Sequence, residues 1–79
     1  MCVKLVFLGR LEDAAGGAQR DAAAGPLATL LAGLEPELAR ALSADRVRLA
    51  LNGMLVADRA ALVLADGDEL AFLPPVSGG

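Results

Sequence analysis

The chain has 79 residues, a formal net charge of −3 and no His, Tyr or Trp. This length accommodates one small domain and leaves little room for a deep active-site cleft. His is the most common general acid–base and the usual activator of a nucleophilic Ser or Cys, and it is missing here. We therefore do not expect the chain to be an enzyme on its own.

Cysteine and charge also restrict the class of protein. Cys2 is the single cysteine, so an internal disulfide and a cysteine-based zinc site are both excluded, which favours a reducing cytoplasm. The basic residues form no cluster, so we expect no nucleic-acid or membrane partner. No segment approaches the roughly 20 apolar residues of a membrane span. The excess of acidic residues favours a partner with a basic surface.

The first half of the chain predicts strands and helices. Val3–Leu8 alternates as a strand does, with its odd-numbered residues facing a core and its even-numbered residues facing the other way. Residues 11–15 predict a short helical turn, closed by two glycines. Residues 18–24 predict a second strand only weakly, because Ala is a poor strand former.

A helix begins near Pro26, a residue tolerated in a first turn. Its apolar residues recur at spacings of three and four, which predicts one buried stripe: Leu27, Leu30, Leu31 and Leu34. Pro36 opens a second short helix that ends near Leu42.

The second half predicts a hairpin and a final strand. Val47–Leu51 alternates again, and Asn52-Gly53 predicts a type I′ turn, which returns the chain as residues 54–56. A short strand is expected at residues 62–64. The turn Asp66-Gly67-Asp68 leads into the last strand, Glu69–Leu73, with Leu70 and Phe72 on the core face.

This order predicts an α+β fold, with a small mixed sheet and one main helix packed on one face. The first and last strands are the most apolar, so we expect them to lie side by side at the centre of the sheet. Residues 1–75 would form the domain. Residues 76–79 would form a mobile tail, because they contain little to bury.

The chain end carries the most informative motif. Pro74 and Pro75 fix φ near −65° and favour an extended path, so we expect a stiff stalk after the last strand. Gly78 and Gly79 have no Cβ and can enter a narrow channel. The functional group at the tip is the α-carboxylate of Gly79. A carboxylate is a poor acyl electrophile, and activation by ATP to an acyl-adenylate would allow a sulfur or amine nucleophile to attack it.

In length and element order, the chain resembles the small sulfur-carrier subunit of molybdopterin synthase, a ubiquitin-like β-grasp family. The resemblance rests on the Asn52-Gly53 hairpin, the turn at residues 66–69 and the ending Phe72-Leu73-Pro74-Pro75 before Gly78-Gly79. Two features depart from the family pattern. Leu73 stands where a second aromatic residue is common, and residues 18–24 are unusually rich in Ala.

The resemblance implies a sulfur carrier in molybdenum cofactor biosynthesis. A ubiquitin-activating-type adenylyltransferase would consume ATP to adenylate Gly79, and a sulfur donor would convert it to a thiocarboxylate. The large subunit of molybdopterin synthase would then accept the tail and pass the sulfur to cyclic pyranopterin monophosphate. The carrier would bind no cofactor or metal stably. The tail that enters the partner consists of Pro74, Pro75, Val76, Ser77, Gly78 and Gly79.

The outward face of the predicted sheet is apolar where a solvated face would be polar. We expect Leu8, Leu55 and Leu73 to form a partner interface there, because an exposed apolar patch marks an interaction surface. The alternative is that loops cover this face.

Three other functions fit the same sequence. The chain fits a sulfur carrier for thiamine or another sulfur metabolite, and it fits a protein modifier whose tail forms an isopeptide bond to lysine. It also fits a binding module with an idle tail. A neighbouring gene for the large synthase subunit would favour the molybdopterin role over another sulfur pathway. Attachment of the chain to other proteins would indicate a modifier. Function that is retained without Gly78-Gly79 would indicate a binding module.

Overall fold

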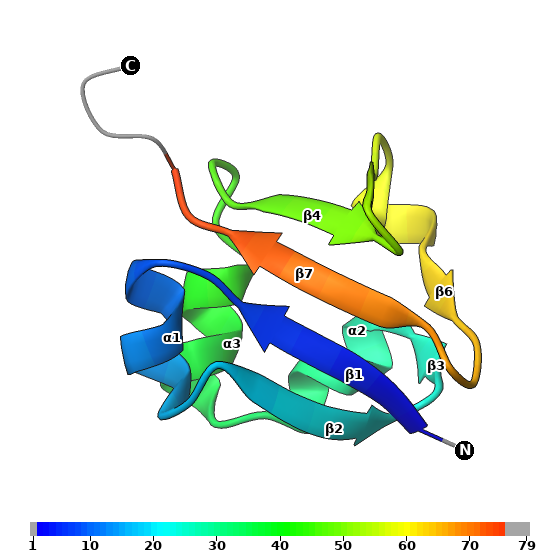
Figure 1. Cartoon of the computed structure of the whole chain (residues 1–79), viewed down its shortest axis with the longest axis horizontal. Helices are drawn as coiled ribbons and strands as arrows, with labels where there is room; N and C mark the ends of the chain where they lie inside the picture. Colours follow the sequence, from blue (N-terminus) through cyan, green and yellow to red (C-terminus); the bar gives the residue numbers. More distant parts are fainter. Residues whose placement is uncertain (1, 76–79) are drawn as a thin grey trace.

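The centre of the molecule is a five-stranded mixed sheet, and the structure, a computed structural model, describes residues 2–75. The strand order is β2-β1-β7-β4-β5 (Figure 1). β1 and β7 are neighbours, as the sequence predicts. These two strands are parallel, and the other pairs are antiparallel. The strands are β1 (Cys2–Phe7), β2 (Gln19–Ala23), β4 (Arg48–Leu51), β5 (Met54–Leu55) and β7 (Glu69–Leu73).

A second, two-stranded sheet joins β3 (Gly25–Pro26) to β6 (Val63–Leu64), and the 3₁₀ helix η1 (Arg59–Ala61) precedes β6. The short strand near residues 62–64 is predicted by the sequence, whereas its partner β3 is not. A Gly-Pro pair is atypical of strands, and proline is tolerated only at an edge such as this one.

Three short helices share the helical side of the fold: α1 (Arg10–Ala15), α2 (Leu27–Ala32) and α3 (Pro36–Leu42). Figure 1 shows α2 and α3 behind the sheet, and α1 close to the point where β1 ends. The sequence predicts one main helix from Pro26. It also predicts a second short helix opened by Pro36, and both helices are present: α2 ends before Gly33, and α3 runs from Pro36 to Leu42. Pro26 is the extended N-cap of α2 and lies just outside the helix. The α+β β-grasp class is confirmed.

The core lies between the sheet and the helices. The rings of Phe7 and Phe72 stack with their centroids 5.6 Å apart, joining the two central strands. All three odd-numbered side chains of β1 are buried, as predicted. The sheet contributes Val3, Leu5, Phe7, Leu49, Leu70 and Phe72, and the helices contribute Leu11, Leu27, Leu30, Leu38 and Leu42.

The hairpin between β4 and β5 forms at the predicted turn. Asn52 and Gly53 both have positive φ, 49° and 87°, as a type I′ turn requires. After the turn, Val56 packs against the core from a half-buried position. Met54 is 76% exposed, because β5 is an edge strand that lacks the neighbour on its outer side that would cover the residue.

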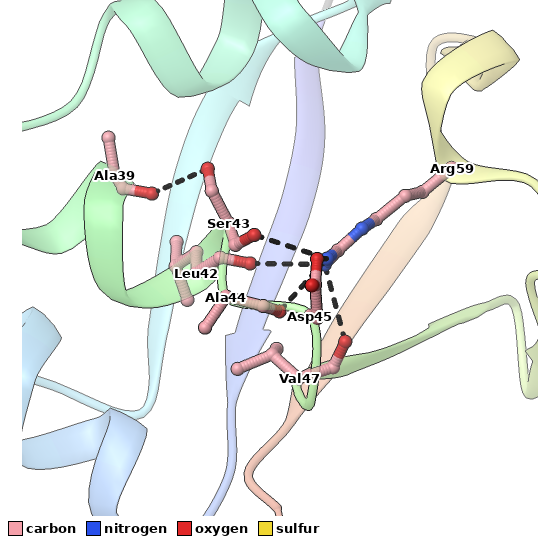
Figure 2. A network of polar contacts seen from close by, with 7 residues as sticks. All are labelled: Ala39, Leu42, Ser43, Ala44, Asp45, Val47 and Arg59. Atoms are coloured by element: carbon pink, nitrogen blue, oxygen red, sulfur yellow. Dashed lines mark hydrogen bonds and ion pairs between the residues drawn. The ribbon is translucent and has the colours of Figure 1, made fainter.

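Arg59 joins η1 to the segment between α3 and β4 (Figure 2). Its guanidinium donates hydrogen bonds to four backbone carbonyls, those of Leu42 (3.4 Å), Ser43 (3.1 Å), Ala44 (2.9 Å) and Val47 (3.3 Å). The last carbonyls of a helix have no partner within the helix, so a side chain that reaches them stabilises the helix end. Arg59 therefore holds the chain at the start of β4.

No helix within residues 2–75 is both long and apolar enough to span a membrane.

Candidate functional site

The chain end leaves from the middle of the sheet. β7 lies between β1 and β4, with Phe72 paired to Phe7 on one side and Leu73 paired to Arg48 on the other. The strand ends at Leu73, where Pro74 follows, since proline cannot donate a backbone hydrogen bond to a neighbouring strand. The base of the tail is therefore positioned by two strands.

Pro74 packs against the loop that follows β1. A Cβ built on Gly9 would lie 2.8 Å from Cγ of Pro74, closer than non-bonded carbon atoms approach. Gly9 also has a φ of 56°, a region that residues with a Cβ rarely adopt. Nearby, the Leu8 amide donates to the Phe72 carbonyl at 3.1 Å. The first proline of the tail therefore packs directly against Gly9.

Of the predicted tail, the structure describes Pro74 and Pro75, which are both half-buried. Val76, Ser77, Gly78 and Gly79 lie outside the described residues. Their predicted entry into a partner active site, and the role of the Gly79 carboxylate, therefore stay predictions.

The outward face of the sheet carries an apolar patch. Leu8 is 41% exposed and Leu55 is 68% exposed, so the described loops leave both open to solvent, while Leu73 is half-buried. Leu8 and Leu73 lie beside the tail, and Leu55 lies on β5. A row of paired residues crosses four strands and connects Leu55 with the residues beside the tail. The row consists of Val6, Ala71, Ala50 and Leu55. We call these six residues the outer patch: Val6, Leu8, Ala50, Leu55, Ala71 and Leu73.

Charged residues lie at both ends of the outer patch. At the end away from the tail, Lys4 pairs with Asp21 on β2 and with Glu69 on β7. At the tail end, Arg48 lies opposite Leu73. A partner that covers the patch therefore meets an arginine near the base of the tail and a mixed group of charges at the far end.

A groove lies along the base of the tail, and we call it the root groove. Its charged residues are Asp45, Arg46, Arg48 and Arg59, and its other lining residues are Val47, Leu49, Val56, Ala57, Pro74 and Pro75. Arg59 is engaged with backbone carbonyls and has Asp45 at 3.8 Å. Sequence reasoning missed this groove, because its arginines come from two separate segments and form no cluster in the sequence.

The acidic turn before β7 has a structural role. The Asp68 carboxylate accepts hydrogen bonds from the Ala65 amide (2.8 Å) and from Nδ2 of Asn52 (3.1 Å), and these two donors lower the pKa of Asp68. Asp66 accepts from the amide of Cys2 at 2.9 Å. Across the described residues, no three potential metal-ligating side chains of His, Cys, Asp or Glu converge. The carboxylates of this turn tie it to the β4–β5 hairpin and to the start of β1.

The fold resembles known structures along its whole length. The solution structure of small archaeal modifier protein 1 from Methanosarcina acetivorans matches with a TM-score of 0.80 and 25% identity, covering 99% of this chain and 96% of that one. The protein of the same name from Haloferax volcanii matches with a TM-score of 0.75 and 27% identity over both full chains. In the comparison with curated proteins, none matches this chain.

A third structure contains a partner protein. It is the complex of subunits 1 and 2 of molybdopterin-converting factor from Helicobacter pylori, which matches with a TM-score of 0.68 and 27% identity over both full chains. The fold and its neighbours define a small ubiquitin-like β-grasp carrier or modifier. The ThiS family model matches residues 5–79. The chain belongs to the ThiS family.

Proposed function

We propose that the chain is the sulfur carrier of molybdopterin synthesis. The observation that carries this proposal is the chain end: the central strand β7 ends at Leu73, Pro74 and Pro75 follow it directly, and the given sequence then ends in Gly78-Gly79. The similarity to the molybdopterin-converting factor subunit supports the assignment. The ATP and sulfur that this chemistry needs suit the cytoplasmic location that the sequence favours.

The chemistry takes place on the carboxylate of Gly79. One carboxylate oxygen bonds to the α-phosphorus of ATP, pyrophosphate leaves, and the acyl carbon becomes electrophilic. Hydrosulfide supplied by the donor then attacks that carbon and loses its proton, the bond to the phosphate oxygen breaks, and AMP departs, which leaves a thiocarboxylate. In the large synthase subunit, this sulfur bonds to cyclic pyranopterin monophosphate, and water then cleaves its bond to the acyl carbon and restores the carboxylate of Gly79. The activating enzyme and the large subunit catalyse these steps, and the chain itself carries the sulfur.

The outer patch supports the partner part of the proposal. The patch adjoins the base of the tail, so a protein that covers Leu8 and Leu73 is also placed to receive the residues after Pro75. We propose that the large synthase subunit and the activating enzyme use this face in turn. Both must accept the same chain end, which explains why one surface would serve two partners.

A second candidate function is protein modification. It is favoured by the similarity to two small archaeal modifier proteins, with TM-scores of 0.80 and 0.75. In that case an amine would attack the activated Gly79, and an amide would form instead of a thiocarboxylate. A thiamine-pathway carrier would share the thiocarboxylate and differ only in the acceptor of the sulfur.

Incubation with the activating enzyme, ATP and a sulfide source tests the proposal. We expect intact-mass spectrometry to show a gain equal to the mass difference between sulfur and oxygen, localised to the terminal peptide. Addition of the large subunit and cyclic pyranopterin monophosphate should then yield molybdopterin. Deletion of Gly79 should abolish sulfur transfer and leave the melting temperature nearly unchanged.

Three results would contradict this function. A persulfide on Cys2, which is exposed on β1, would move the reactive group to the other end of the chain. Attachment of the chain to lysine side chains would favour the modifier role. Molybdopterin formation by the chain that lacks Gly79 would exclude the terminal carboxylate.

A further inference from the structure

The root groove has a charge opposite to that of the whole chain. The chain has a net charge of −3, yet the groove is lined by three arginines and one aspartate. Arg59 is committed to the backbone, as described above. Arg46 and Arg48 are exposed, and neither makes an ion pair with another residue in the range 2–75. The guanidinium groups of Arg46 and Arg48 are thus available to a ligand at the base of the tail.

The position of the groove points to a protein ligand. Pro74 and Pro75 line it together with Arg46 and Arg48, and Arg48 also borders the outer patch opposite Leu73. A partner that covers the outer patch and accepts the tail therefore passes along this groove. Arginine is suited to such a site, because its planar guanidinium pairs with a carboxylate through two hydrogen bonds.

We propose that the root groove binds an acidic segment of the protein that receives the tail. Carboxylates of that segment pair with Arg46 and Arg48 beside the two prolines. The segment fixes the base of the tail while the outer patch provides the apolar contact. This inference deepens the proposed function, because its partner is the protein that accepts the activated chain end.

A phosphate ligand fits the position less well. Four residues follow Pro75, and an extended chain of four residues spans about 13 Å. When an extended tail enters an active site, a nucleotide attached to Gly79 lies that far from the groove. A protein segment at the entrance of the channel lies directly against it.

Charge reversal in the full-length chain tests the proposal. The variants are Arg46→Glu, Arg48→Glu and the double variant, and Arg40→Glu is the matched control. Arg40 is an exposed arginine in the last turn of α3 and does not line the groove. Isothermal titration calorimetry would measure binding to the large synthase subunit and to the activating enzyme, at low and high salt. Circular dichroism would check the fold.

We expect the double reversal to weaken binding to at least one of the two partners by about tenfold or more, and the Arg40 control to change it less than twofold. Added salt should weaken binding of the unmodified chain more than that of the double variant, since the attraction removed is a screened charge interaction. Substitutions to Gln at the same two positions should give an intermediate loss.

Unchanged affinity of the folded double variant for both proteins would overturn the proposal. An equal loss in the Arg40 control would also overturn it, because the effect would then follow net charge and not the groove. If the double variant binds both proteins normally and loses only binding of AMP, the groove recognises phosphate and the proposal is wrong. Sulfur loading of the unmodified chain is measured separately by mass, so a failure of the proposed function is distinguishable from a failure of this inference.

Discussion

Gly9 and Pro74 are far apart in the sequence and meet at the base of the tail. The ring of Pro74 occupies the space that a Cβ on Gly9 would need, and Gly9 itself has a positive φ. A side chain at Gly9 would therefore have two effects: it would strain the backbone at positive φ, and it would displace the ring of Pro74. A glycine that has a positive φ but no close neighbour allows the first effect to be measured alone. Gly67 has a φ of 88°, and a Cβ built there would meet nothing within 4 Å.

We therefore expect Gly9→Ala and Gly67→Ala to differ in function. Both should lower the free energy of unfolding by about 1–3 kcal/mol, because alanine is strained at positive φ. Only Gly9→Ala should also slow sulfur loading, because the added Cβ displaces the ring of Pro74 from its position against residue 9. The measurements are chemical denaturation and the initial rate of thiocarboxylate formation. A second change, Pro74→Ala, should restore part of the rate lost in Gly9→Ala. Equal loading rates in the two glycine variants would show that this contact does not position the tail.

Single residues were also where sequence reasoning was weakest. The exposure of Met54 follows from its place on an edge strand, and that place depends on which strands pair. The role of Gly9 depends on a contact with a residue 65 positions later. Alternation along one segment tells which face a side chain takes, but it does not tell what covers that face.

At the scale of elements, the side chain of Arg59 acts as a clamp on the segment that connects α3 to β4. The segment from Leu42 to Val47 leaves α3, turns and enters β4, and four of its carbonyls accept from one guanidinium (Figure 2). The Arg59 side chain is 28% exposed, so water replaces these bonds only in part. Its loss would leave partly buried carbonyl groups without donors.

We expect Arg59→Met to lower the free energy of unfolding by about 1.5–3 kcal/mol, the range for hydrogen bonds that involve a charged group. Arg59→Lys should restore only part of the loss, since an ammonium lacks the planar fork that reaches several carbonyls. Arg40→Met, on the exposed side of α3, is the control and should change stability little. Urea denaturation measures all three. An Arg59→Met protein as stable as the unmodified chain would show that the clamp contributes nothing.

The elements of the fold were largely predictable, for reasons that differ from one element to the next. β1 and β7 have clear alternation, and Asn52-Gly53 marks its own turn. β2 was only weakly indicated, because Ala and polar residues are poor strand formers, but pairing with β1 over five positions overrides that local preference. β3 was missed because two residues carry no periodicity. The two helices α2 and α3 were both predictable, because Pro36 marks the start of the second one after the first ends before Gly33.

At the scale of the whole molecule, the outer patch and the root groove meet at the base of the tail. Leu73 borders both, since it belongs to the patch and lies opposite Arg48 of the groove. The patch was predictable from alternation, because the neighbours of core residues in a strand must point the other way. The groove was not, because it forms only when the turn before β4, the segment before η1 and the two prolines come together.

The outer patch is tested by comparing variants that carry a new charge on the patch with a variant that carries the same charge beside it. Leu73→Asp and Leu55→Asp introduce a carboxylate on the outward face, while Met54→Asp introduces one at the adjacent residue, whose side chain points to the opposite side of β5. Met54 and Leu55 are comparably exposed, 76% and 68%, so the two changes differ mainly in the face they alter. We expect all three proteins to fold. Arg48 lies opposite Leu73 and provides an opposite charge for the new carboxylate there.

We expect Leu73→Asp and Leu55→Asp to weaken binding to the large synthase subunit and to the activating enzyme, and Met54→Asp to leave both affinities within about twofold. Fully burying one Leu against a partner is worth about 1.5–3 kcal/mol, so each loss should be about ten- to a hundredfold in affinity. Calorimetric titration of the folded variants measures it. Because the Leu55 contact is apolar, its contribution should persist at high salt, unlike that of Arg46 and Arg48. If Leu73→Asp unfolds the domain, Leu73 belongs to the core and the face assignment is wrong. If Met54→Asp weakens binding as much as Leu55→Asp, the partner covers the edge of the hairpin and not the outward face.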